Sequence, residues 1–454
     1  MSIPQQGGGP IESRAQLAEY LEAGCTPRAA WRIGTEHEKF GYCADTLRPL
    51  PYEGPRSVRA VLEGLRDQFG WRAVEEAGRI IGLQKNGANV SLEPGGQLEL
   101  SGAPLETIHH TCEEANQHLA EVKEVAGEIG VKFLGLGVAP HWRLDDMPVM
   151  PKGRYDIMRA YMRKVGSHGL DMMFRSCTIQ VNLDFADEAD MVQKLRVGLS
   201  LQPLATALFA ASPLIDGRPS GHVSMRGRIW RDVDPDRTGI PAFVFEPGFG
   251  FERWVDYALD TPMYFVFRGG RYIDASGQSF RDFLDGRLAA APGETPTLSD
   301  WADHLTTLFP EARIKRFMEM RGADGGPWRR ICALPAFWVG LLYDQGALDA
   351  AWDLVKGWTQ EERLALRRDA ADVGLRAQIR GRSLQDFALE VLEIAAAGLR
   401  ARAKAGDFDT DETHFLNELR QVAESGETLS DEILRRWRGE WAQKFEPLFD
   451  TYSF

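Results

Sequence analysis

The sequence contains no apolar run of the roughly 18 residues that a transmembrane helix needs. Its opening residues, MSIPQQGGGP, also lack the basic and apolar regions of a secretory signal peptide. We therefore expect a cytoplasmic protein that has no membrane partner.

Basic residues are fewer than acidic ones. The 454 residues include 53 Lys and Arg against 66 Asp and Glu, which gives a formal net charge of −13. A chain with this charge has no general attraction to nucleic acid or to an anionic lipid surface. We therefore predict no nucleic-acid partner.

Cysteine is also scarce. The five cysteines show no CxxC or other metal-binding spacing, and five cysteines in a cytosolic chain normally stay reduced. The residues by themselves therefore argue against a disulfide framework. The GxxxxGK[ST] loop and the protein-kinase signatures are absent as well, and the nine histidines are scattered without a Ser/His/Asp arrangement.

The residues that are present describe an ordinary globular protein, with 44% hydrophobic and 26% charged residues. Hydrophobic periodicity and turn residues predict a mixture of helices and strands. The expected helices span 13–23, 57–69, 106–130 and most of the chain after 346, and the expected strands span 79–84, 89–93, 97–100, 131–138, 175–185 and 262–268.

The stretch RIGTEHEKFGY sets Glu36 and Glu38 two residues apart in a predicted strand. Side chains two apart point to the same face of a strand, so the two carboxylates stand side by side and His37 faces the other way. Either this is an edge strand protected by charge, or a positive group lies between the carboxylates.

Further charged groups recur on predicted strands. SLEPGGQLELSG places Glu93 and Glu99 on neighbouring strands, and strand alternation in RIKRFMEMRGADGG puts Arg313, Lys315, Glu319 and Arg321 on one face. Grouped carboxylates suit a hard cation such as Mg²⁺, and Arg or Lys beside them suits a phosphate or a carboxylate.

The stretch RSCTIQVNLDF alternates polar and apolar residues. Its polar face carries Ser176, Thr178, Gln180, Asn182 and Asp184. Such a face can be exposed to water in a one-sided antiparallel sheet. These side chains are short hydrogen-bonding groups, which favours the alternative, a lined cavity.

Seven motifs in uninterrupted order resemble the plant and proteobacterial type of glutamate–cysteine ligase. They are TEHEKFGY, SLEPGGQLELSGAPLET, MPKGRYDIM, GLDMMFRSCTIQVNLDF, SMRGRIWRDVDPDRTG, VDYALDTPMYFVFR and HLTTLFPEARIKRFMEMRGADGGPWRRICALPAFWVGLLYD. The resemblance runs from about residue 17 to beyond residue 343, and the helical C-terminal part is less distinctive.

The resemblance implies an α+β fold, with a curved antiparallel six-stranded sheet ringed by helices and an architecture similar to that of glutamine synthetase. We expect an N-terminal tail and short helix over 1–30, a catalytic domain over 31–345, and a helical region over 346–454 packed on it. The implied reaction joins the γ-carboxylate of L-glutamate to the amine of L-cysteine with ATP cleavage, through γ-glutamyl phosphate, in the first step of glutathione synthesis.

Site residues follow from the resemblance by position. It implies Mg²⁺ ligands at Glu36, Glu38, Glu93, Glu99, Gln180 and Glu319. It implies glutamate binding by Arg226 with Thr178 and Asn182, catalytic roles for Arg226 and Arg321, and ATP binding by Arg313, Lys315, Arg321, Lys152 and Arg154. The PKGR segment that holds Lys152 and Arg154 has a surface turn as its alternative. Trp230 and Tyr264 are candidates to shape the cysteine pocket, with core packing as their alternative.

The resemblance also changes the expectation for the cysteines, because Cys112 and Cys332 match a pair that forms a regulatory disulfide in this family. The expected partners are the three small-molecule substrates, and the chain is a monomer or a homodimer. Two rival hypotheses remain: a ligase with another amine acceptor, and a catalytically inert redox or metabolite sensor that keeps the fold.

Overall fold

The computed structural model describes residues 8–404, 406 and 411–454. The first seven residues of the predicted N-terminal tail lie outside the described residues. Within the described chain, the main feature is a nine-stranded sheet whose strands pair antiparallel. Eight strands follow the order β14-β15-β7-β1-β5-β4-β3-β2, and β6 pairs with the far end of β1. The prediction of an antiparallel sheet combined with helices is confirmed.

The strands of this sheet are β1 (Ile33–Cys43), β2 (Arg72–Glu76), β3 (Arg79–Lys85), β4 (Ala88–Leu92), β5 (Leu98–Ser101), β6 (Val131–Leu134), β7 (Thr178–Leu183), β14 (Ala312–Ile314) and β15 (Met318–Asp324). Two-residue and four-residue strands form smaller pairs: β8 (Leu214–Ile215) with β9 (Arg218–Pro219), β10 (Thr238–Gly239) with β13 (Phe309–Pro310), β11 (Phe265–Arg268) with β12 (Arg271–Asp274), and β16 (Gln378–Ile379) with β17 (Arg382–Ser383). The strand predicted at 262–268 is therefore β11, outside the main sheet.

The helices are α1 (Ala15–Glu22), α2 (Val58–Phe69), α3 (Ile108–Glu128), α4 (Gly153–Met162), α5 (Gly169–Arg175), α6 (Glu188–Leu208), α7 (Met225–Ile229), α8 (Phe251–Asp260), α9 (Phe280–Leu284), α10 (Leu298–Leu305), α11 (Trp328–Leu342), α12 (Gln345–Val355), α13 (Gln360–Val373), α14 (Leu384–Arg402), α15 (Asn417–Ser425), α16 (Leu429–Arg438) and α17 (Glu446–Tyr452). Short 3₁₀ helices lie at Arg28–Ala30, Leu144–Asp146, Ala242–Phe245, Gly374–Arg376 and Glu412–Leu416.

Turn chemistry explains the meander from β3 to β5. The β3–β4 connection contains Asn86 and Gly87, both with positive φ, as a tight hairpin turn requires. Gly96, also at positive φ, lies in the Pro-Gly-Gly turn between β4 and β5. The β4–β5 turn sets the register that places Glu99 of β5 opposite Ser91 of β4, and on its other side β5 pairs with β1, where Glu99 lies opposite Glu38.

The prediction of a single strand in RIKRFMEMR is wrong. RIKRFMEMR is not a single strand but a hairpin, in which β14 and β15 pair antiparallel after a turn where Lys315 N–H donates to the Phe317 carbonyl at 2.8 Å. Arg313 and Glu319 therefore oppose each other across the hairpin. Strand alternation could not show this, because the turn lies in the middle of the motif and contains no Gly or Pro.

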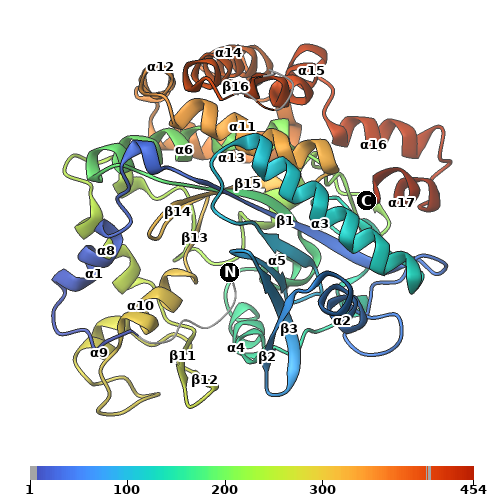
Figure 1. Ribbon diagram of the computed structural model, residues 1–454. Coiled ribbons are helices and arrows are strands. Elements are labelled where there is room, and N and C mark those ends of the chain that lie inside the picture. Colours follow the sequence, from blue (N-terminus) through green and yellow to red (C-terminus); the bar gives the residue numbers. More distant parts are fainter. Residues whose placement is uncertain (1–7, 405, 407–410) are drawn as a thin grey trace.

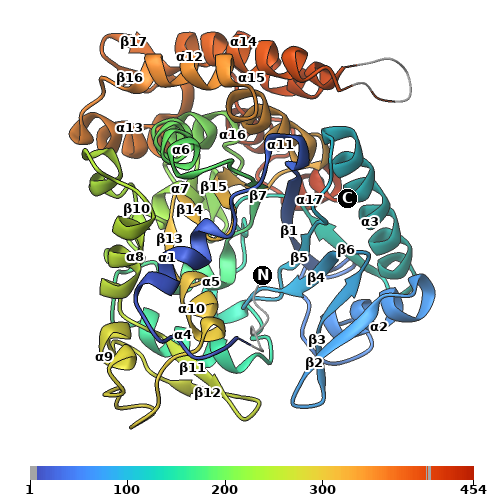
Figure 2. The same cartoon turned by 60° about the vertical axis from the view of Figure 1, so that its left-hand side comes forward.

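Helices cover the sheet in two groups. α2 and α3 pack over β1, β3 and β6, and α6 and α11 pack over β7 and β15. Helices α12, α14 and α15 form a further layer above α6 and α11 (Figures 1 and 2), where α14 packs on α11 and α12 on α6, and α13 packs beside α6. Helices α12 to α15 thus contact the sheet through α6 and α11, whereas the C-terminal residues contact it directly, because the Phe454 N–H donates to the Phe133 carbonyl of β6 at 3.0 Å. The proposed boundaries at 30 and 345 stay a prediction.

Among the described helices, none is by itself long and apolar enough to cross a membrane. Taken together, α11 and α12 are long and apolar enough, but the two helices meet at a bend of 89°.

A disulfide joins Cys112 of α3 to Cys332 of α11, with Cα atoms 5.4 Å apart. The pairing implied by the family resemblance is therefore present. The expectation from cysteine number alone, that all five cysteines stay reduced, is wrong for this pair. The two residues are 220 positions apart, and only the packing of α3 against α11 brings them together.

The close approach of α11 and α14 generates a stability prediction. A Cβ on Gly398 would overlap the carbonyl oxygen of Gly340, whereas a Cβ on Gly127 of α3 would meet nothing within 4 Å. We expect Gly398→Ala to lower the free energy of unfolding by about 1–3 kcal/mol, since backbone cannot yield as a side chain does. Gly127→Ala should keep or raise it. Urea unfolding of both variants tests this, and equal stability would contradict the packing.

The disulfide generates a second prediction. A bond that closes so long a loop restricts the unfolded chain, so reduction should lower the free energy of unfolding by about 2–5 kcal/mol. Thermal melting with and without dithiothreitol measures the effect. The wild type and a Cys25→Ser control should respond to the reductant, whereas a Cys112→Ser/Cys332→Ser double variant should not. The same response in the double variant would show that another cysteine is responsible.

Candidate functional site

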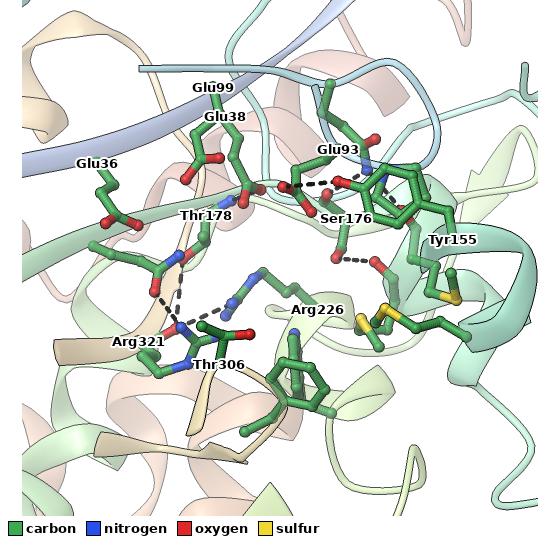
Figure 3. A pocket seen from close by; sticks show the side chains of 18 of the residues that line it. Glu36, Glu38, Glu93, Glu99, Tyr155, Ser176, Thr178, Arg226, Thr306 and Arg321 are labelled. Atoms are coloured by element: carbon green, nitrogen blue, oxygen red, sulfur yellow. Dashed lines mark hydrogen bonds between the residues drawn. The ribbon is translucent and has the colours of Figure 1, made fainter. Parts of the chain in front are cut away.

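A cavity opens on the polar face of the sheet, where charged side chains of several strands converge (Figure 3). The space inside it, including its open mouth, is about 820 Å³. Its lining residues are Glu36, Glu38, Glu93, Pro94, Gln97, Glu99, Arg154, Tyr155, Met158, Met172, Met173, Ser176, Thr178, Gln180, Arg226, Trp230, Thr306, Phe309, Arg313 and Arg321. The polar face of RSCTIQVNLDF therefore lines this cavity with Ser176, Thr178 and Gln180, which agrees with the second of the two alternatives.

Four carboxylates gather on one side of this cavity. Glu36 and Glu38 project from β1, Glu99 from β5, and Glu93 from the residue after β4. Burial raises the pKa of Glu38 well above its usual range, and the charges of Glu93 and Glu99 raise it further. Burial also raises the pKa of Glu36. Glu38, whose pKa is raised by burial and by neighbouring negative charges, therefore favours a bound cation.

Neighbouring polar groups orient these carboxylates. The Thr178 backbone N–H donates to Glu38 Oε2 at 2.9 Å, and Asn182 Nδ2 donates to Glu36 Oε1 at 2.8 Å. The Ser91 hydroxyl donates to Glu99 Oε2 at 2.7 Å. These bonds leave other oxygens of the group open, and carboxylate oxygens are the donors that Mg²⁺ prefers. As the side chains stand, however, the described chain holds no group of three or more His, Cys, Asp or Glu residues arranged to bind a metal.

Three arginines face the carboxylates from the other side of the cavity. Arg226 comes from α7, Arg313 from β14 and Arg321 from β15. Arg226 is 3% exposed, and its Nη2 donates to the Arg321 carbonyl at 3.0 Å while its Nε has no partner. Burial and the nearby Arg313 charge lower the pKa of Arg321 to about 10. All three side chains can receive an anionic ligand.

Glu319 is the counter-ion of this basic group rather than a lining residue. It is 1% exposed and forms ion pairs with Arg313, with Lys315 at 2.7 Å and with Arg321 at 3.7 Å. Burial raises the pKa of Glu319, but the three cations outweigh it and hold the pKa well below its usual range. Gln180, the other expected metal ligand beyond the glutamates, accepts from Arg321 Nη1 at 2.7 Å.

Asp324 supports Arg226 and was not predicted from the sequence. Its carboxylate accepts from the hydroxyls of Ser212 and Ser224 at 2.6 and 2.7 Å and from the Ala211 N–H at 2.8 Å. Ser224 is the N-cap of α7, so Asp324 holds the helix start that presents Arg226. Its only signal in the sequence is an acidic residue at the end of the β15 segment MEMRGAD.

A second cavity adjoins the first and shares Glu36 and Thr306 with it. Lys315 and Asn182, both predicted site residues, line this second cavity and not the first. The remaining lining residues are Tyr20, Arg32, Gly34, Gly87, Asn89, Ser101, Gly102, Pro104, Asp184, Ala302, Arg316 and Phe317. The predicted residues thus divide between two connected spaces.

The remaining predicted residues differ in whether they line the first cavity or lie buried behind it. Arg154 lines the first cavity, but Lys152 is 1% exposed and its Nζ donates to the Leu92 carbonyl at 2.8 Å. The PKGR segment is not a surface turn, because it leads directly into α4 with Lys152 as the N-cap. Trp230 lines the cavity, whereas Tyr264 is fully buried with the Arg237 guanidinium 4.0 Å from its ring centroid. Core packing therefore describes Tyr264.

Comparison with known proteins gives a consistent result. The family model described as glutamate-cysteine ligase family 2 matches residues 32–450. Over 442 residues the chain is 54% identical to chloroplastic glutamate–cysteine ligase B of Oryza sativa subsp. japonica, covering 97% of this chain and 87% of that protein. The chloroplastic enzymes of Nicotiana tabacum and Arabidopsis thaliana are also 54% identical, and the match covers 97% of this chain and 83% of each.

A solved structure shares the fold. Glutamate–cysteine ligase from Francisella tularensis in complex with AMP superimposes with a TM-score of 0.56 at 14% identity, covering 92% of this chain and 86% of that one. One expectation fails: these plant relatives are named as chloroplastic proteins, which contradicts the prediction of a cytoplasmic location.

The charges of the site predict opposite effects of two similar substitutions. Glu319→Gln leaves three buried cations without their counter-ion and should lower the free energy of unfolding by about 3–5 kcal/mol. Glu38→Gln removes one of several crowded carboxylates and should keep or raise it. Unfolding in EDTA measures both values. Equal losses would show that Glu38 is as well compensated as Glu319.

Proposed function

Because the chain belongs to glutamate–cysteine ligase family 2, we propose that its cavity joins the γ-carboxylate of L-glutamate to the amine of L-cysteine with cleavage of ATP. The observation that carries the proposal is the opposition of four carboxylates and three arginines across one buried space. This is the arrangement needed to bring an anionic carboxylate to an anionic phosphate. The reaction is the first step of glutathione synthesis.

The chemistry has two displacement steps. An oxygen of the glutamate γ-carboxylate attacks the γ-phosphorus of ATP, the bond to the ADP oxygen breaks, and γ-glutamyl phosphate forms. The cysteine nitrogen then attacks the acyl carbon, the carbon–oxygen bond to phosphate breaks, and the nitrogen loses a proton. Positioning and charge neutralisation dominate such transfers.

The arginines receive the anionic groups. Arg321 and Arg313 lie on adjacent strands and are assigned to the transferring phosphate, where their fixed geometry costs no reorganisation. Arg226 is assigned to a carboxylate of glutamate, since its buried Nε has no partner in the described chain. Thr178 forms the neighbouring wall, and Asn182 orients Glu36.

The glutamate cluster is assigned to divalent metal. Glu36, Glu38, Glu93 and Glu99 have the donor chemistry for Mg²⁺, which would supply positive charge to the phosphate oxygens when bound. Gln180 and Glu319 remain predicted ligands, and both now pair with arginine. The raised pKa values of Glu36 and Glu38 agree with a group that needs a cation.

Each substrate is assigned to one of the two adjoining cavities. The second has Lys315 and Arg316 for phosphates and the rings of Tyr20 and Phe317 for a base, so the nucleotide is assigned there. The Francisella enzyme was solved with AMP, which agrees with a nucleotide substrate. The first cavity then takes the two amino acids, and the shared Glu36 marks the point where phosphoryl transfer occurs.

The finer architecture and regulation are also proposals. Six adjacent strands, from β14 through β4, carry the cavity residues, and we assign them to the curved catalytic sheet of glutamine-synthetase type. The Cys112–Cys332 disulfide is proposed to favour the active form when oxidised. The chain acts as a monomer or a homodimer.

Trapping of the acyl phosphate tests the proposal. With Mg²⁺, ATP and L-glutamate, hydroxylamine should yield γ-glutamyl hydroxamate, and L-cysteine should yield γ-glutamylcysteine with equimolar phosphate. Glu36→Gln should lower both rates about 100-fold or more, because one lost electrostatic contact at a transferring group has effects of this size. Its melting temperature should not fall.

An exposed residue supplies the control, because Glu124→Gln on α3 should keep both rates. Wild-type activity in Glu36→Gln would remove the metal assignment. If phosphate appeared only with another amine, the acyl-phosphate chemistry would stand and the acceptor would be wrong. No phosphate under any condition would favour the inert sensor.

A further inference from the structure

One wall of the first cavity differs in chemistry from the rest. It is built by α4 and α5, which contribute Arg154, Tyr155 and Met158 from the former and Met172 and Met173 from the latter. In Figure 3 the sulfur atoms lie on the side of Tyr155, away from Glu36. These sulfur atoms are methionine thioethers, because no cysteine lines the cavity.

Arg154 is a buried cation without an anionic partner in the described chain. It is 4% exposed, and neither its Nε nor its Nη1 has a hydrogen-bond partner. Its Nη2 donates to the Thr306 hydroxyl at 3.3 Å, and the guanidinium lies 4.9 Å from the Phe265 ring centroid. A buried guanidinium with two open donors is costly unless an anion completes it, and a carboxylate matches its fork geometry.

The methionines beside Arg154 define what the rest of the ligand must be. Met158 follows Arg154 by one helical turn on α4, and it is 6% exposed, while Met173 is 2% exposed. Thioethers accept hydrogen bonds weakly and pack well against a small polarizable group such as a thiol. A hydroxyl in the same place would lose its hydrogen bonds with water.

We propose that this wall is the subsite of the acceptor amino acid, with Arg154 binding its α-carboxylate and Met158 and Met172 surrounding its side chain. The proposal rests on the ligase function proposed above and adds the residues that select the acceptor. It also moves Arg154 from the nucleotide, where the sequence placed it, to the acceptor. The nucleotide cavity does not include Arg154.

Acceptors with and without a carboxylate test the role of Arg154. Cysteamine is cysteine without the α-carboxylate, so Arg154→Gln should lower kcat/KM for L-cysteine about 10- to 100-fold, the usual effect of losing a charge-assisted hydrogen bond. It should leave kcat/KM for cysteamine within about twofold. The KM values for ATP and glutamate should stay near those of the wild type. Arg154→Lys, which keeps the charge but loses the fork, should recover part of the loss.

The matched control removes an equivalent charge elsewhere on the helix. Arg163 is the exposed C-cap residue of α4, and Arg163→Gln should change neither acceptor. Hydroxamate formation reports on the rest of the site. If Arg154→Gln also loses the hydroxamate reaction, or if its KM for ATP rises while both acceptors fall alike, Arg154 serves the phosphoryl transfer or the fold and the proposal is overturned.

Failure of the subsite and failure of the proposed function give different results. If the wild type forms no hydroxamate, the ligase function fails and the subsite fails with it. If hydroxamate forms but Arg154→Gln keeps the wild-type kcat/KM for cysteine, only the subsite fails.

The role of the methionines is tested separately, by the preference of the enzyme for cysteine over serine as the acceptor. Met158→Gln adds a hydrogen-bonding group and should lower the ratio of the two kcat/KM values about tenfold, because serine then regains a partner. Met158→Leu keeps an apolar wall of similar volume and should keep the ratio. An unchanged ratio in Met158→Gln would remove this residue from the acceptor pocket.

Discussion

The alternation of side chains along β1 is the constraint on which the site depends. Glu36 and Glu38 face the cavity, whereas His37 and Lys39 face the interior beneath α3. Lys39 is fully buried, its Nζ lies 2.9 Å from His118 Nε2, and burial lowers its pKa to about 7. A slip of one residue would exchange these faces. Pairing on both sides of β1, with β5 and with β7, opposes such a slip.

The arginines and the carboxylates of the site differ in how far neighbouring charges compensate them. Three arginines have buried acidic support: Glu319 pairs with Arg313 and Arg321, and Asp324 supports the helix that carries Arg226. Among the described residues, no basic side chain forms an ion pair with the carboxylates of β1 and β5, and burial and the charges of Glu93 and Glu99 raise the pKa of Glu38. The fold therefore keeps its arginines in place and leaves its carboxylates in need of a cation. This difference suits a reaction that joins two anions.

The disulfide lies behind the same strands. α3 packs on β1, and α11 packs on β7 and β1, so the Cys112–Cys332 bond clamps the two helices against the strands that carry the carboxylates and the polar stripe. The methionine wall, by contrast, comes from α4 and α5, outside the sheet. In the proposed assignment, strands supply the charged groups for the phosphoryl transfer, and helices supply the surface that contacts the acceptor.

Local pattern in the sequence was enough to determine the meander and its turns, the helices with clear periodicity, and the common face of Glu36 and Glu38, because each depends on residues only a few positions apart. The family resemblance added the cysteine pair and the arginines. Neither revealed the hairpin of β14 and β15, the pairing of Glu319 with three cations, or the support of Arg226 by Asp324. Only the tertiary structure decided these, and it also decided that Arg154 stands without an anionic partner beside the methionines. The reason is physical: burial and charge compensation depend on neighbours that are tens to hundreds of residues away, and a pattern of sequence spacing contains no record of which side chains share a cavity.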